Sequence, residues 1–178
     1  NQYQIMFVKR FPEPTVTPSA SVQSLTGVQT LWLKYPTDST APSHKDTETL
    51  LLDPLTKDLY VVTKRTTTAR VYRAPYPQST TQASPTIMQY KGDLSWPSVS
   101  GEISTTGGDV SFDGSQIMVR RYGIDRASIW HRTLGSSFWS AFSGYQCNIP
   151  VESEPRGEAI GFDREGKGQK NDSKKGPQ

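Results

Sequence analysis

The sequence predicts an all-β fold built from short antiparallel strands. Helical periodicity is nearly absent from the 178 residues, whereas short apolar runs rich in β-branched and aromatic residues recur between turn residues. Only 33% of the residues are hydrophobic, but eight Tyr, six Phe and four Trp supply large apolar side chains. The chain is therefore long enough and apolar enough for one domain with a core.

The first strands are expected over residues 5–8 and 30–35. The first ends at the proline-containing segment 11–14, and in the second Leu31 and Leu33 alternate with polar or aromatic neighbours and so share one face. Residues 36–45 are expected to form a loop.

Residues 48–90 show a clearer unit of four strands. The strands are predicted over residues 48–52, 59–63, 69–74 and 86–90. The intervening turn, at 53–58, contains Asp and Pro, which favour bends. Four antiparallel strands within about forty residues is the size of one β-propeller blade.

The same pattern recurs later in the chain. Strands are predicted over residues 109–112, 116–121 and 127–132, with a fourth near 138–142, and a third copy begins at 158–163. The turn aspartates Asp53, Asp113 and Asp163 are 60 and 50 residues apart, and unequal spacing is normal where insertions fall in loops. The sequence therefore predicts a partial β-propeller of about three four-stranded blades over residues 1–163, an incomplete ring.

Residues 164–178 are predicted to form a flexible basic tail, because apolar alternation stops at Asp163. The tail has five basic and two acidic residues, which accounts for the whole formal charge of +3. The body is neutral, so no nucleic-acid partner is expected. No apolar run approaches the roughly 20 residues of a membrane span. Because the chain opens at Asn1 directly in strand-like sequence, a processed or excised piece is expected.

The single cysteine, Cys147, excludes a disulfide within the chain. A free cysteine is usually a small buried apolar residue. The alternative for Cys147 is a bond to another chain.

Several stretches resemble one family of proteins. They are residues 46–54 (DTETLLLDP) with 59–64 (LYVVTK), residues 107–114 (GGDVSFDG) and residues 157–160 (GEAI). They are similar to secreted β-propeller proteins common in actinobacteria, which are related to the phytase-like and esterase-like propellers.

The resemblance covers most of the chain, from about Ile5 to Asp163. It implies a secreted protein with a six-bladed ring or a close variant. Blades before Ile5 are absent, and a polar tail replaces the second strand of the last blade. We therefore expect a second copy or a complementary chain to complete the propeller.

Four carboxylates are candidate metal ligands. The first strand of each propeller blade lines the central channel, and Glu48, Asp109 and Glu158 begin those strands, with Asp46 close by. Converging carboxylates repel one another unless they are protonated, paired or bound to a cation, and Ca²⁺ prefers such oxygen ligands. A calcium ion in the channel is the prediction; the alternative is that each carboxylate pairs with a nearby Lys or Arg or faces water.

Four cations and one aromatic residue are candidates for ligand binding. Lys64 and the pair Arg120 and Arg121 end second strands at matching positions, where they could meet an anionic ligand unless they pair with acidic neighbours. Arg156 stands near an acidic strand start. The four tryptophans are expected to fill the packing between blades. Trp96, which precedes a proline in a loop, is the best exception and could stack on a sugar.

Two functions are compatible with these observations. The first is a secreted binding module with a calcium-stabilised channel and a small-molecule or glycan ligand on one rim. The alternative is a metal-dependent phosphoester or ester hydrolase of the phytase-like type. The sequence has no Gly-x-Ser-x-Gly elbow, and only Arg156 accompanies an acidic strand start, which favours binding. Whether the protein is an enzyme stays open, because fold does not determine function.

Overall fold

The computed structural model describes residues 5–16, 22–37, 46–64, 68–94, 96, 104–122, 126–152, 154, 157–163 and 169–173. Within these ranges the protein is all-β, with thirteen strands and one short 3₁₀ helix, η1 (Trp139–Ser143). In the same ranges there is no helix of the length and apolarity needed to cross a membrane.

The strands form four sheets, and all neighbouring strands are antiparallel except β2 and β6. The first sheet has the order β1 (Ile5–Arg10), β2 (Gln29–Lys34) and β6 (Thr86–Ile87). The second has β3 (Thr47–Leu52), β4 (Leu59–Thr63), β5 (Ala69–Ala74) and β7 (Gln89–Leu94). The third has β8 (Thr105–Val110), β9 (Gln116–Arg121), β10 (Arg126–His131) and β11 (Gln146–Pro150). The fourth has β12 (Gly157–Phe162) and β13 (Gln169–Ser173).

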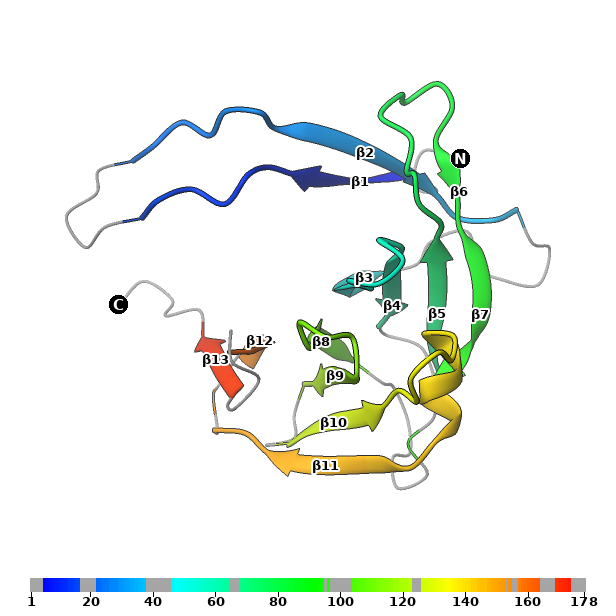
Figure 1. Ribbon diagram of the computed structural model, residues 1–178, viewed down its shortest axis with the longest axis vertical. Coiled ribbons are helices and arrows are strands. Elements are labelled where there is room, and N and C mark those ends of the chain that lie inside the picture. Colours follow the sequence, from blue (N-terminus) through cyan, green and yellow to red (C-terminus); the bar gives the residue numbers. More distant parts are fainter. Residues whose placement is uncertain are drawn as a thin grey trace.

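The second, third and fourth sheets diverge from a common inner edge formed by β3, β8 and β12 (Figure 1). β8 contacts β3 on one side and β12 on the other. The second and third sheets extend outward from this edge to β7 and β11 (Figure 1). The described sheets do not close into a ring.

Apolar side chains pack each sheet face to face against the next, since alternate residues of a strand point to opposite faces. The core between the second and third sheets includes Leu51, Tyr60, Val62, Val71, Ile117, Val119, Trp130 and Phe138. The core between the first and second sheets includes Leu31, Leu33, Tyr35, Val61, Tyr72 and Met88. The core between the third and fourth sheets includes Met118, Ala127, Ile129 and Ile160.

Three strand predictions are corrected by the structure. The predicted strand 109–112 is β8, which spans Thr105–Val110 and so begins four residues earlier and ends before Ser111. The predicted strand near 138–142 is the helix η1, and the outer strand of the third sheet is β11 instead. Phe138, Ala141 and Phe142 lie three and four residues apart and therefore share one helical face, which packs on the core. The predicted strand 86–90 is divided, because β6 pairs in parallel with β2 whereas β7 joins β5.

Part of the predicted flexible tail is a strand. Residues 169–173 form β13, which pairs with β12 through main-chain hydrogen bonds. An edge strand needs few apolar side chains, because the main chain of its neighbour supplies the pairing. The rest of the predicted tail, residues 164–168 and 174–178, lies outside the described residues.

The turn between β3 and β4 is stabilised by Asp53. Its Oδ1 atom accepts a hydrogen bond from the Leu55 N–H (3.0 Å), and its Oδ2 atom accepts one from the Thr56 hydroxyl (2.8 Å). The Lys57 N–H donates to the Asp53 carbonyl oxygen (2.8 Å), and Lys57 adopts the left-handed conformation with φ of 64°.

Replacing Lys57 with glycine should leave the free energy of unfolding unchanged or raise it by up to about 1.5 kcal/mol. Glycine removes the left-handed cost of roughly 1–2 kcal/mol but restores about 0.5–1 kcal/mol of backbone entropy in the unfolded chain. Urea denaturation measures the difference. A clear loss of stability would show that the Lys57 side chain holds the turn.

Candidate functional site

The structure places the predicted metal ligands at the inner edge. Glu48 lies on β3, Asp109 on β8 and Glu158 on β12, and Asp46 immediately precedes β3. These are the three strands that lie innermost in Figure 1. Glu48 and Glu158 lie near the start of their strands as predicted, whereas Asp109 lies near the end of β8 and not at its start. The four side chains do not form a ligand group among the described residues.

Glu48 and Asp109 are each engaged by protein groups. The Glu48 carboxylate forms an ion pair with Lys64, which immediately follows the neighbouring strand β4. Asp109 accepts two main-chain hydrogen bonds, from the Val110 N–H to Oδ1 (2.8 Å) and from the Phe162 N–H to Oδ2 (2.8 Å). Asp109 therefore fastens β8 to β12, in place of the predicted metal role.

The predicted calcium site does not fit these side chains. Within the described ranges, no three His, Cys, Asp or Glu residues are grouped so that they could hold a metal ion. Asp46 is exposed, and its carbonyl oxygen accepts the Lys64 N–H (2.9 Å), whereas Glu158 is half-buried on β12. Of the four carboxylates, Glu48 is paired with Lys64, which is the kind of pairing predicted as the alternative to a metal, and Asp109 accepts main-chain N–H groups.

Arg120 is a structural cation and not an open ligand-binding group. Its side chain is buried, and its Nη1 atom lies 2.7 Å from Glu154 Oε2. The same nitrogen donates a long hydrogen bond to the Ala159 carbonyl oxygen on β12 (3.4 Å). The guanidinium also lies directly against Gly157, where any larger side chain would overlap it. Arg120 thus joins β9 to β12, and its bond to Glu154 is the pairing with an acidic neighbour that was predicted as the alternative to ligand binding.

Lys64 and Trp96 are also buried. Lys64 pairs with Glu48, and Trp96 donates its indole N–H to the Ser128 hydroxyl (2.9 Å) and packs edge-on against Trp130. Trp96 is therefore a core residue between sheets and offers no open face to a sugar. Arg156 lies outside the described residues.

Arg121 lies over the Trp96 ring, 4.6 Å from its centroid. It is half-buried, and burial lowers the pKa of its guanidinium to about 10. This cation–π contact covers the face of Trp96. Arg121 is thus a packing partner of Trp96 in this structure and not an exposed rim cation.

Cys147 is exposed on β11, which corrects the expectation of a buried cysteine. β11 is the outer strand of its sheet, so only β10 lies beside it in that sheet.

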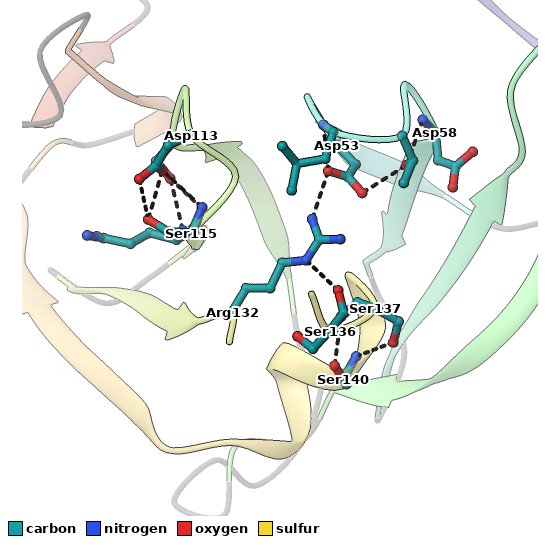
Figure 2. Close-up of polar contacts among 12 residues, drawn as sticks. Asp53, Asp58, Asp113, Ser115, Arg132, Ser136, Ser137 and Ser140 are labelled. Carbon is teal, nitrogen blue, oxygen red and sulfur yellow. Dashed lines mark hydrogen bonds and ion pairs between the residues drawn. The ribbon is translucent and has the colours of Figure 1, made fainter. Parts of the chain in front are cut away.

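Sequence reasoning missed a buried ion pair between the second and third sheets. Arg132 Nη1 lies 2.9 Å from Asp53 Oδ1, and the side chains are 7% and 0% exposed. Figure 2 shows Arg132 reaching from the end of β10 to the β3–β4 turn, with its Nε donating to the Ser136 carbonyl oxygen (3.0 Å). Asp53 was recognised only as a turn residue, because nothing local indicates a partner 79 positions away.

A second ion pair lies at the outer end of the same turn. Arg73 Nε lies 2.7 Å from Asp58 Oδ2, and the Tyr76 N–H donates to Asp58 Oδ1 (2.8 Å). Burial alone raises the pKa of the Asp58 carboxyl, but hydrogen bonds from Arg73, Tyr76 and Thr56 outweigh burial and hold it below its ordinary value. Asp58 therefore acts as a structural anion.

The hairpin of β1 and β2 has an exposed apolar face. Met6 and Val8 pack inward on the second sheet, so Ile5 and Phe7 point outward, where they are 38% and 58% exposed. Trp32, which pairs in register with Phe7, lies beside it with ring centroids 5.7 Å apart. We call Ile5, Phe7 and Trp32 the outer hairpin face.

No family model and no curated protein sequence matches this chain. The resemblance to secreted propellers therefore stays a prediction, and function has to be argued from the surfaces themselves.

Proposed function

We propose that the protein is a secreted β-propeller-type binding module whose outer hairpin face receives a further blade. The proposed partner is a second copy of the chain. A complementary chain is the alternative source of the same kind of sheet.

The apolar outer hairpin face carries this proposal. A strand buried on one side alternates apolar and polar residues, whereas a strand buried on both sides is apolar throughout. β1 begins Ile-Met-Phe-Val, so both of its faces are apolar, yet only the inward face is covered by the second sheet. Such a patch on a folded surface is typical of an interaction site.

The packing of the other sheets indicates what kind of partner fits. The first sheet packs on the second, the second on the third, and the third on the fourth, always through one apolar face each. Another sheet stacked on Ile5, Phe7 and Trp32 would repeat this interface. Sheets that stack around a shared inner edge are typical of propeller blades, which supports the proposal.

Binding is favoured over hydrolysis by what the candidate residues do. Glu48 and Asp109 are engaged by Lys64 and by main-chain N–H groups, and Arg120 by Glu154. Groups held in this way stabilise contacts between strands and are not arranged around a shared reacting atom.

Replacing Phe7 with glutamate should abolish self-association, because a carboxylate in a dry sheet interface would lose its hydration. The neighbouring Lys9 ammonium, which lies over the Phe7 ring, would offset only part of that cost. Native mass spectrometry and light scattering measure the mass. The wild-type protein is expected to form an assembly of defined mass, and the Phe7→Glu variant is expected to be a monomer. An unchanged far-ultraviolet circular dichroism spectrum would show that the variant is folded.

Leu134→Glu is the matched control, since Leu134 is also exposed but lies in the loop after β10. It should assemble as wild type does. A wild-type monomer at all attainable concentrations would overturn the second copy as partner. Equal loss of assembly in both variants would overturn the role of the hairpin face.

A further inference from the structure

A cavity of about 450 Å³ lies between the β1–β2 hairpin and the β3–β4 end of the second sheet. Its volume falls within the range of small-molecule sites, which is roughly 300–1,000 Å³. The described lining residues are Val8, Lys9, Arg10, Phe11, Leu31, Leu50, Leu52, Lys57, Leu59, Tyr76 and Gln78.

The wall of the cavity that β3 forms consists of apolar side chains that are exposed to solvent. Leu51 is buried in the core with the third sheet, so alternation turns Leu50 and Leu52 to the opposite face. There they line the cavity and are 42% and 54% exposed. The core between hairpin and second sheet is built on β4 and β5, and it leaves these two leucines uncovered. Phe11, which is also exposed, lines the same cavity.

The charged groups at the cavity are basic. Arg10 and Lys57 line it, and none of the described lining residues is acidic. The Arg10 guanidinium bonds the side-chain amide of Gln29, and the Lys57 ammonium lies 5.5 Å from the centre of the Tyr76 ring. Both contacts are with neutral groups, so neither neutralises the positive charge.

Lys9 contributes differently from the other two cations. Its ammonium donates to the Thr30 hydroxyl (2.6 Å) and lies over the Phe7 ring, on the outer side of the hairpin. The charge that faces a ligand in the cavity therefore comes from Arg10 and Lys57.

The main chain of Lys57 is held in place by the loop that follows β5. The Gln78 amide donates to the Lys57 carbonyl oxygen (3.0 Å) and to the Ala74 carbonyl oxygen (3.2 Å). The turn carrying Lys57 is thus fixed to the cavity wall before any ligand arrives, which lowers the entropic cost of binding.

We propose that this cavity binds a small amphipathic anion, a carboxylate with an unbranched apolar body. The apolar body lies over Leu50, Leu52 and Phe11, and the carboxylate accepts hydrogen bonds from Arg10 and Lys57. The site is on the opposite side of β1 from the outer hairpin face, because Val8 lines the cavity whereas Phe7 points away from it. The proposal therefore does not depend on assembly with a second copy.

Isothermal titration calorimetry with three probes of equal chain length tests the charge requirement. The probes are decanoate, decanol and decylammonium. Decanoate should bind, decanol should bind about tenfold more weakly or worse, and decylammonium should not bind. Equal binding of all three, or preference for the ammonium, would overturn the proposal.

Substitutions of residues that line the cavity test whether decanoate binds there. Arg10→Glu, Lys57→Gly and Leu52→Asp should each weaken decanoate binding by about tenfold or more. Arg126→Glu is the matched control, since Arg126 is exposed on β10, away from the cavity lining, and undergoes the same charge reversal as Arg10. It should bind as wild type does. Equal weakening by Arg126→Glu and Arg10→Glu would show nonspecific charge attraction and overturn the proposal.

The assembly assay keeps the two proposals apart. Phe7→Glu should lose assembly and keep decanoate binding, whereas Leu52→Asp should lose decanoate binding and keep assembly. The thermal unfolding transition of each variant checks that the variant is folded. Lys57→Gly is the variant that we expect to perturb folding least, because glycine readily adopts the left-handed conformation found at that position.

Discussion

Replacing Arg132 with methionine should lower the free energy of unfolding by about 3–5 kcal/mol. Methionine keeps most of the apolar volume but leaves the fully buried Asp53 carboxylate without its counter-ion. The Leu55 N–H and the Thr56 hydroxyl still donate to Asp53, but neither neutralises the charge. Urea denaturation followed by tryptophan fluorescence measures the loss.

Arg70→Met is the matched control for this experiment. Arg70 lies 3.9 Å from Asp93, and both side chains are about one-third exposed, so its pair should contribute about 1 kcal/mol or less. Adding Asp53→Asn to Arg132→Met should recover part of the stability, because the asparagine amide can still accept in the turn while the unpaired charge disappears. Equal small losses for Arg132→Met and Arg70→Met would show that the buried pair does not join the two sheets.

Replacing Gly107 with alanine should separate β12 from β8 and destabilise the protein by about 3 kcal/mol or more. A Cβ at Gly107 would lie 2.1 Å from the Glu158 carbonyl oxygen, which is main chain and cannot rotate away. The strand must therefore move, and the bond from the Phe162 N–H to Asp109 Oδ2 would be lost with it. Hydrogen exchange should show faster exchange at β12 than in wild type, together with a lower Tm.

Gly144→Ala provides the comparison. The nearest atom to its added Cβ would be the Ala141 carbonyl oxygen at 3.2 Å, and Gly144 is exposed with an ordinary negative φ. Its effect should stay within about 0.5 kcal/mol, as for most surface substitutions. If Gly107→Ala behaved like Gly144→Ala, the close approach of β8 and β12 would be wrong.

Local pattern was sufficient to predict most strands and the turn aspartates. β4, β5, β9 and β10 coincide with the runs of β-branched and aromatic residues within one or two positions at each end. Asp53 and Asp113 form the predicted turns, and Asp113 accepts bonds from the Ser111 and Ser115 hydroxyls (2.7 and 2.8 Å). These features depend on neighbours within a few residues, which is why the sequence reveals them.

The candidate site was predicted less well, because it depends on pairing between distant residues. Arg120 and Lys64 were recognised as cations, but their partners Glu154 and Glu48 decide that they are structural. The sequence places Trp96 in a loop. Its hydrogen bond to the Ser128 hydroxyl and the packing of Arg121 over its ring show that it belongs to the core.

The order of residues by itself determined that the described part of the protein is all-β and where the turns at Asp53 and Asp113 lie. Only the tertiary structure decided that Asp53 meets Arg132, that Asp109 fastens β12, and that Leu50 and Leu52 are left open beside Arg10 and Lys57. The physical reason is that a strand's periodicity specifies which side chains share a face. The sheet that packs against that face, or leaves it open, is specified by contacts far apart in the chain.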